Sequence, residues 1–182
     1  MKTTLSVVTL LVVLVFAVVG GRSSPAQEKQ DKYTLQIPGG LAFSEIKGYE
    51  QWQVVGPSLT EAANVIRVIV ANPVMIKAYQ EGVPPSGKPF PDGSKIAKLQ
   101  WNPKKSTVAP FVVDVPDTFT QAFFIEKDSK RFPNSGGWGY ALFNYDAAAD
   151  TFTADASPDN CGHACHTVVK AKDYIFHPYQ KR

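Results

Sequence analysis

The residues with the clearest capacity for chemistry form one short stretch near the C-terminal end, Asn160-Cys161-Gly162-His163-Ala164-Cys165-His166. In the c-type haem motif C-x-x-C-H, each cysteine thiol adds to a vinyl group of haem and the histidine binds the iron. Here the spacing is C-x-x-x-C-H, one residue longer. Residues four positions apart on a helix differ by about 40° around its axis, so Cys161, Cys165 and His166 can still face one porphyrin. We therefore expect one covalently attached haem c, with His166 as the metal ligand.

Two other uses of the same residues remain open. Cys161 and Cys165 can form a local disulfide in an oxidising compartment, or they can join His163 and His166 in a zinc site. The haem interpretation is favoured because haem attachment requires a histidine directly after the second cysteine, whereas a disulfide has no use for it. We expect the His163 side chain to point away from the haem. His177 is a candidate sixth iron ligand, although a surface position is the simpler expectation.

Composition limits the class of protein. The chain has 182 residues, of which 44% are hydrophobic and 19% charged, and this predicts one globular domain rather than a disordered chain or a membrane bundle. Its 19 basic and 16 acidic side chains leave a net charge of only +3. Such a small excess gives no reason to expect a nucleic-acid partner.

The first segment has the pattern of an export signal. Lys2 precedes a 15-residue apolar run at 5–19, which is shorter than the roughly 20 residues that a membrane-spanning helix needs. Small residues follow, and Ser24-Pro25-Ala26 offers a cleavage site. We expect a signal peptide over residues 1–26 and a periplasmic or secreted protein. The alternative is an uncleaved membrane anchor, which also places the folded part outside the cytoplasm.

The mature chain reads as one α+β domain. A polar N-terminal arm and opening segment at 27–48 precedes the expected haem domain at 49–182. β-Branched residues at 64–70 predict a strand, and Asn72-Pro73 predicts a short helix at 74–81. Further strands are expected at 95–101, 111–115, 119–125 and 138–145. Alternation places Ile96, Lys98 and Gln100 on one face of their strand. The expected fold is a mostly antiparallel β-sheet with a few short helices and a c-type haem on one side.

Several blocks of the chain, in order from about Tyr49 to Tyr179, resemble a known family. They are Tyr49 to Gly56, Ile66-Arg67, Asn72-Pro73, Ala78-Tyr79, Phe90-Pro91-Asp92-Gly93-Ser94, Lys98, Lys127 to Phe132, and Gly137-Trp138-Gly139-Tyr140. In this order they resemble the cytochrome P-460 and cytochrome c′-beta proteins. The resemblance implies a β-rich periplasmic protein with one c-type haem, usually five-coordinate and often dimeric. It also implies that His166 is the proximal ligand and that Cys161 and Cys165 are the attachment sites.

The same resemblance implies roles for two cationic side chains. Lys98 matches a strand lysine that bonds covalently to a porphyrin meso-carbon in cytochrome P-460. Arg67 matches an arginine on the distal side of the haem. The simpler alternatives are a solvated strand lysine for Lys98 and a sheet-surface ion pair for Arg67.

The residues opposite the proximal ligand are less specific. Phe123 and Phe124 are candidates for an aromatic cap over the haem, as in cytochrome c′-beta. Glu126, beside that aromatic strand, is the candidate proton acceptor, and Asp155 and Asp159 are the alternatives. Each of these side chains also has an ordinary explanation, as a core aromatic or a solvated carboxylate.

Three functions remain in competition. The resemblance to cytochrome P-460 implies oxidation of hydroxylamine or a related small nitrogen compound, with nitric oxide as co-reactant, nitrous oxide as product and a soluble redox cytochrome as electron acceptor. The resemblance to cytochrome c′-beta implies non-enzymatic binding of nitric oxide or carbon monoxide. The third function is a haem-free secreted binding module with a Cys161–Cys165 disulfide. We prefer the first because Lys98 matches the oxidising branch. A homodimer is compatible with either haem protein.

Overall fold

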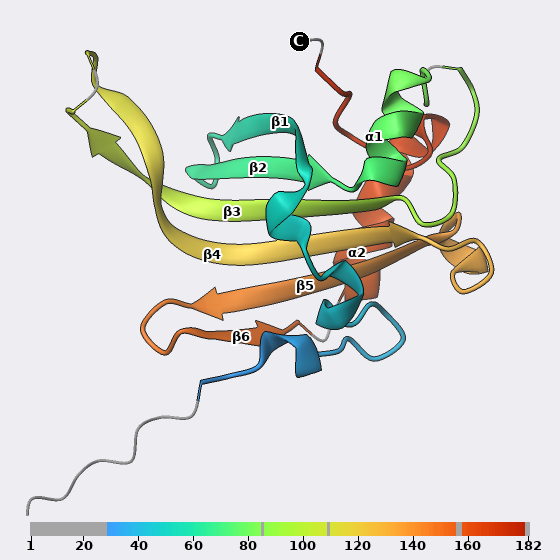
Figure 1. Cartoon of the computed structure of the whole chain (residues 1–182), viewed down its shortest axis with the longest axis horizontal. Helices are drawn as coiled ribbons and strands as arrows, with labels where there is room; N and C mark the ends of the chain where they lie inside the picture. The colour runs from blue at the N-terminus through green and yellow to red at the C-terminus, as the bar shows by residue number, and fades with distance from the viewer. Residues whose placement is uncertain (1–28, 85, 109, 156–157, 181–182) are drawn as a thin grey trace, which may run out of the picture.

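The computed structural model describes residues 29–84, 86–108, 110–155 and 158–180, with only the backbone described at 158–161 (Figure 1). The predicted signal peptide at 1–26 lies outside these residues. The strands are β1 (Gln53–Thr60), β2 (Val65–Ala71), β3 (Lys95–Ser106), β4 (Val113–Lys127), β5 (Trp138–Asp146) and β6 (Thr151–Ala154). The helices are α1 (Pro73–Gln80), α2 (Pro158–His166) and the 3-10 helices η1 (Lys32–Thr34), η2 (Phe43–Ile46), η3 (Tyr49–Gln51), η4 (Pro133–Ser135) and η5 (Thr167–Lys172). No helix within these ranges is long and apolar enough to span a membrane.

The strands form one six-stranded sheet in chain order, and every neighbouring pair is antiparallel. This arrangement confirms the predicted α+β class. The predicted strands at 64–70 and 138–145 and the predicted helix at 74–81 match β2, β5 and α1 within about one residue. β1 and β6 were not predicted, because neither segment carries a long β-branched run.

The prediction of two strands at 111–115 and 119–125 is wrong. The structure has one continuous strand, β4, which passes through Pro116 and pairs it with Pro103 of β3. Pairing of β3 with β2 ends at Trp101, and pairing of β4 with β5 begins at Gln121, so this part of the hairpin extends beyond its neighbours (Figure 1). A proline that lacks an N–H is tolerated where a strand has no partner on its outer side.

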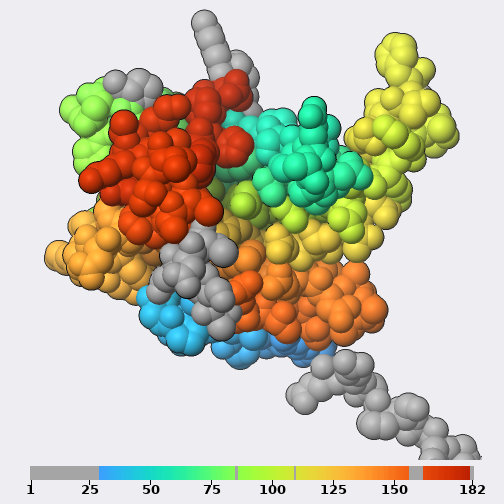
Figure 2. Space-filling model, turned by 180° about the vertical axis from the view of Figure 1, so that it is seen from behind, coloured from blue at the N-terminus to red at the C-terminus, as the bar shows by residue number. Residues whose placement is uncertain are grey.

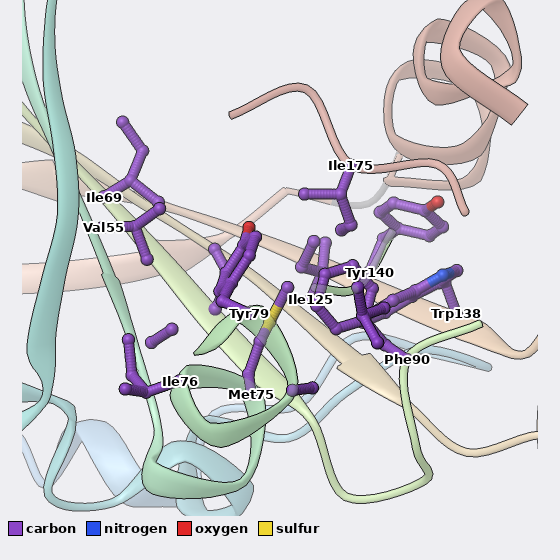
Figure 3. Close-up of a cluster of buried hydrophobic side chains, with 14 residues drawn as sticks. Val55, Ile69, Met75, Ile76, Tyr79, Phe90, Ile125, Trp138, Tyr140 and Ile175 are labelled. Atoms are coloured by element: carbon purple, nitrogen blue, oxygen red, sulfur yellow. The ribbon is translucent and has the colours of Figure 1, made fainter. Parts of the chain in front are cut away.

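The two faces of the sheet are covered by different segments. On one face, the opening segment with η2 and η3 packs its buried side chains Ile37, Leu41, Phe43 and Ile46 against Phe124 and Phe143. The opposite face is covered at one end by α1, α2 and the C-terminal segment, as Figures 1 and 2 show. Its core includes Ile69, Ile96, Ile125, Tyr140 and Ile175, and most of these side chains are labelled in Figure 3.

Asn72 ties the start of α1 to the start of β3. Its buried side-chain oxygen accepts hydrogen bonds from the backbone N–H groups of Met75, at 3.1 Å, and Lys95, at 3.0 Å. Its Nδ2 donates to the carbonyl of Gly93 at 2.8 Å. One side chain therefore caps the helix and fixes the strand that carries Lys98.

We predict that Asn72→Ala lowers the free energy of unfolding by about 2–4 kcal/mol, because it removes a helix cap and leaves buried backbone groups without partners. Asn72→Asp keeps the two accepted hydrogen bonds and is expected to lose less. Urea unfolding followed by circular dichroism measures both. A loss below about 0.5 kcal/mol for the alanine variant would contradict the assigned role.

Candidate functional site

A cavity of about 500 Å³ lies between the sheet and the segment formed by α2 and the C-terminal residues. Its apolar wall consists of Ile69, Ile96, Ile125, Leu142 and Ile175. Five of the predicted site residues also line it: Arg67, Lys98, Phe123, Cys165 and His166. Gln121 and Phe176, which the sequence did not assign to the site, complete it together with His177, the candidate sixth ligand. The fold therefore brings residues from β2, β3, β4, β5, α2 and the C-terminal segment to one place.

His166, the last residue of α2, is arranged as a metal-binding histidine. Its Nδ1 lies 2.5 Å from the carbonyl oxygen of Tyr174. A carbonyl can only accept, so Nδ1 carries the proton and Nε2 keeps a lone pair. Burial lowers the pKa of His166 below its ordinary value, which keeps the ring neutral at pH 7. A neutral imidazole whose second nitrogen is held by a carbonyl is the usual form of a histidine that binds a metal.

Aromatic rings hold the imidazole of His166 in place. The ring of Phe123 lies nearly parallel to it, with centroids 6.2 Å apart and an interplanar angle of 16°. Tyr140 and Phe176 meet it edge to face, at 5.3 Å and 4.8 Å. These contacts restrict rotation of the ring, so its free nitrogen has a defined direction.

The cysteine motif lies on α2, as the haem interpretation requires. Cys165 is exposed, lines the cavity and carries a free thiol, so it takes no part in a disulfide here. The side chain of Cys161, one turn earlier, lies outside the described residues. The His163 ring packs against Tyr140 and Tyr174 rather than lining the cavity. In the described part of the chain, no group of three or more His, Cys, Asp or Glu side chains is arranged to hold a metal ion.

Lys98 is half-buried, and no residue that the structure describes forms an ion pair with it. Its Nζ lies 4.6 Å from the centroid of the Phe123 ring. Burial lowers the pKa of Lys98 to about 8, and the positive charge of Arg67 adds to the effect. At neutral pH a fraction of the amine is therefore uncharged, which makes Lys98 both a base and a nucleophile.

Arg67 differs from the expected surface ion pair. Its Nε donates to the side-chain oxygen of Gln100 at 2.9 Å, so its partner on β3 is a neutral amide. Burial lowers the pKa of Arg67 from its ordinary value, although a guanidinium stays charged at every physiological pH. Half-buried positive charge thus faces the cavity.

The structure corrects the placement of Phe124 and Glu126. Successive side chains on a strand point to opposite faces of the sheet. Because Phe123 lines the cavity, Phe124 and Glu126 lie on the other face. Phe124 packs against Phe43 in the other core, with ring centroids 5.3 Å apart. Glu126 forms an ion pair with Lys95 at 3.0 Å. Neither side chain lines the cavity.

The alternative carboxylates and His177 are also placed differently from the sequence expectations. Asp155 does not line the cavity, and the side chain of Asp159 lies outside the described residues. His177, for which a surface position was the simpler expectation, lies in the cavity wall, and burial together with the charges of Lys98 and Arg67 lowers its pKa. Its backbone carbonyl accepts a hydrogen bond from the Tyr79 hydroxyl at 2.9 Å, which fixes this part of the C-terminal segment.

Comparison with known proteins places this chain in a family. The family model described as Cytochrome P460 matches residues 46–177, most of the chain. The chain belongs to the cytochrome P460 family. The resemblance seen in the sequence is therefore confirmed, and the protein is a haem protein of this family. None of the curated proteins matches the chain.

The residues of the cavity fit the haem of a cytochrome P460 protein. The apolar wall suits the faces of a porphyrin, and His166 offers a neutral nitrogen with a free lone pair. The thiol of Cys165 lies in the same wall, beside His166. The donor set is thus one imidazole with a thiol next to it, which is the chemistry that the C-x-x-x-C-H motif predicted.

Gly162 allows α2 to lie this close to the sheet. A Cβ atom at this position would lie 2.7 Å from Cγ of Tyr140, well inside any normal contact. The Tyr140 ring is itself buried in the core, so it cannot move aside easily. A larger residue must therefore push α2, and with it Cys165 and His166, away from β5.

We predict that Gly162→Ala lowers the haem content of the exported protein at least twofold, because the displaced helix no longer presents Cys165 and His166 to the cavity. The ratio of haem to protein measures this. Ala164→Ser, an exposed change on the same helix, is the matched control and should keep full haem content. Full haem content in Gly162→Ala would show that the contact with Tyr140 does not position the motif.

We also predict that the amine of Lys98 titrates near pH 8. Because the charged form is destabilised by burial, the neutral fraction grows on raising the pH through about 8 rather than through the ordinary lysine value. Competitive acetylation of the haem-free chain at several pH values, read by mass spectrometry of peptides, gives the midpoint. Arg67→Gln removes a neighbouring positive charge and should raise the titration midpoint of Lys98. A midpoint near 10.5 in the unaltered chain would contradict the burial of this amine.

Proposed function

We propose that this protein is a periplasmic c-type cytochrome with one haem, attached through Cys161 and Cys165, that oxidises hydroxylamine or a related small nitrogen compound. The observation that carries the proposal is the position of a neutral, oriented His166 in the same cavity as Lys98 and His177. His166 would bind the iron through Nε2. The bound haem supplies an iron atom that holds the small ligand and accepts its electrons.

Two side chains of the cavity can accept the protons that oxidation of hydroxylamine releases. Lys98 is partly neutral at pH 7–8 because burial lowers its pKa to about 8. His177 is neutral because burial lowers its pKa below the ordinary value for histidine. A carboxylate is the acceptor that the sequence suggested, but Glu126 points to the other face of the sheet. Lys98 and His177 replace it in this proposal.

The position of Lys98 also supports the covalent link to the porphyrin that the resemblance implies. The amine lies in the cavity wall beside Phe123 rather than in solvent. A partly neutral amine is the nucleophilic form of lysine. The pattern of residues 1–26 supports export to the periplasm, where a soluble redox cytochrome would take the electrons.

The second candidate function is binding of nitric oxide or carbon monoxide without turnover. It is favoured by the apolar wall of the cavity, which suits a small neutral gas better than a polar substrate. It is also favoured by the absence of a carboxylate among the described residues that line the cavity. Hydroxylamine turnover separates the two functions.

The test uses the full chain, exported in a cell that attaches haem. We expect a mass increased by one haem after denaturation, and loss of the native spectrum in His166→Ala. His163→Ala is the matched control: it removes a histidine from the same helix but not from the cavity, and should keep the spectrum. A reduced Soret band far to the red, lost in Lys98→Ala, together with hydroxylamine-dependent reduction of a soluble cytochrome, supports the oxidase. Gas binding without turnover supports the second function, and a colourless protein contradicts both.

A further inference from the structure

A row of polar side chains crosses four strands and ends at the cavity. Its members, Arg67, Gln100, Gln121 and Asn144, occupy directly paired positions on β2, β3, β4 and β5. Beyond the hydrogen bond from Arg67 to Gln100, the Nε2 of Gln100 donates to Oε1 of Gln121 at 3.1 Å. The Nε2 of Gln121 donates in turn to Oδ1 of Asn144 at 2.8 Å. Gln100 and Gln121 each accept from one strand and donate to the next, Asn144 accepts at the end, and we call this set the cross-strand row.

The cross-strand row fixes the orientation of the Arg67 guanidinium. Its Nε is held by Gln100, whose own side chain is held by Gln121, and successive hydrogen bonds of this kind strengthen one another. Within the described part of the chain, no hydrogen bond or ion pair occupies the two terminal nitrogens of Arg67. Because Arg67 lines the cavity, these two donors are available to a ligand there.

The charge of the cavity is positive and is not balanced by the protein. The charge comes from Arg67 and, in part, from Lys98 on β3, whereas His166 on α2 and His177 in the C-terminal segment are neutral. Cys165 also lines the cavity, and no Asp or Glu is found among the described lining residues. The lowered pKa values of Lys98 and His177 reflect the repulsion from Arg67 as well as burial. A half-buried guanidinium held by a neutral amide is stabilised by an anion that takes its remaining donors.

We propose that the cavity binds small anions with two oxygen atoms, such as formate or nitrite, on the terminal nitrogens of Arg67, and that Gln100 is the residue that positions Arg67 for this. The proposal rests on the proposed function, since the anion would bind beside the haem. A guanidinium donates two parallel hydrogen bonds to a planar group with two oxygens. The anion must be small because the same cavity of about 500 Å³ also holds the haem. The propionate groups of haem share this chemistry and are the other source of a carboxylate.

The test is a titration of the ferric, haem-loaded full chain with sodium formate, followed at the Soret band, beside a titration with nitric oxide as a small neutral ligand. Arg67→Gln should raise the Kd for formate about tenfold or more, and Arg67→Lys by less. Gln100→Leu should raise it several-fold, and Gln100→Glu, which keeps the size but adds a competing carboxylate, at least as much. Nitric oxide affinity should change less than twofold. Lys105→Gln, an exposed lysine of the β3–β4 hairpin, is the matched control for loss of charge.

An unchanged Kd for formate in Arg67→Gln with full haem content overturns the proposal. If Arg67 instead holds a haem propionate, Arg67→Gln lowers the haem content or the temperature at which haem is lost. The ratio of formate affinity to nitric oxide affinity then stays unchanged. This result also overturns the proposal. A change in both affinities by the same factor in the Gln100 variants overturns the role of Gln100, because a merely structural defect does not discriminate between the ligands. A chain without haem contradicts the proposed function and this site together.

Discussion

The hydrogen bond between His166 Nδ1 and the Tyr174 carbonyl connects the two segments on which the site depends. It joins the end of α2 to the C-terminal segment, and it leaves Nε2 as the free nitrogen. Without this bond the imidazole could adopt either tautomer, and the C-terminal segment that carries Phe176 and His177 would lose its direct hydrogen bond to the end of α2. The chemistry of the site and the shape of its wall thus depend on the same contact.

The sheet supplies the rest of the site. One of its faces forms a filled core, and the other forms a wall of the cavity. The face that carries Phe124 and Phe143 is filled by the opening segment and forms an ordinary aromatic core. The other face is covered only at one end, by α1, α2 and the C-terminal residues, and the cavity lies in this cover. Burial disfavours positive charge there, and the contacts that offset it are the neutral amide of Gln100 beside Arg67 and the ring of Phe123 beside Lys98.

Much of the site could be predicted because it depends on local spacing. The C-x-x-x-C-H motif gave Cys165 and His166, and alternation along β3 put Ile96 and Lys98 on one face. Alternation along β4 could also have excluded Glu126, since a strand that turns Phe123 toward the haem turns the residue three positions later away. Gly162 carried a similar signal, because a glycine inside a helical pattern often has a packing reason, here the close approach of the Tyr140 side chain.

The remaining residues could not be predicted from spacing. Gln100, Gln121 and Asn144 look like solvated strand positions, and only the register of four strands brings them into one row. His177 lies in a segment without periodicity, so its place in the wall depends on tertiary packing. The continuous strand β4 was missed because proline usually interrupts a strand, and the rule fails where a hairpin extends beyond its neighbours.

The central claim is that His166 binds the haem iron through Nε2 inside this cavity. A crystal structure of the haem-loaded chain tests it most directly. We predict a bond from His166 Nε2 to iron, with Nδ1 still donating to the Tyr174 carbonyl and the porphyrin against Ile69, Ile96 and Ile125. A haem held by another histidine, or bound outside this cavity, would contradict it.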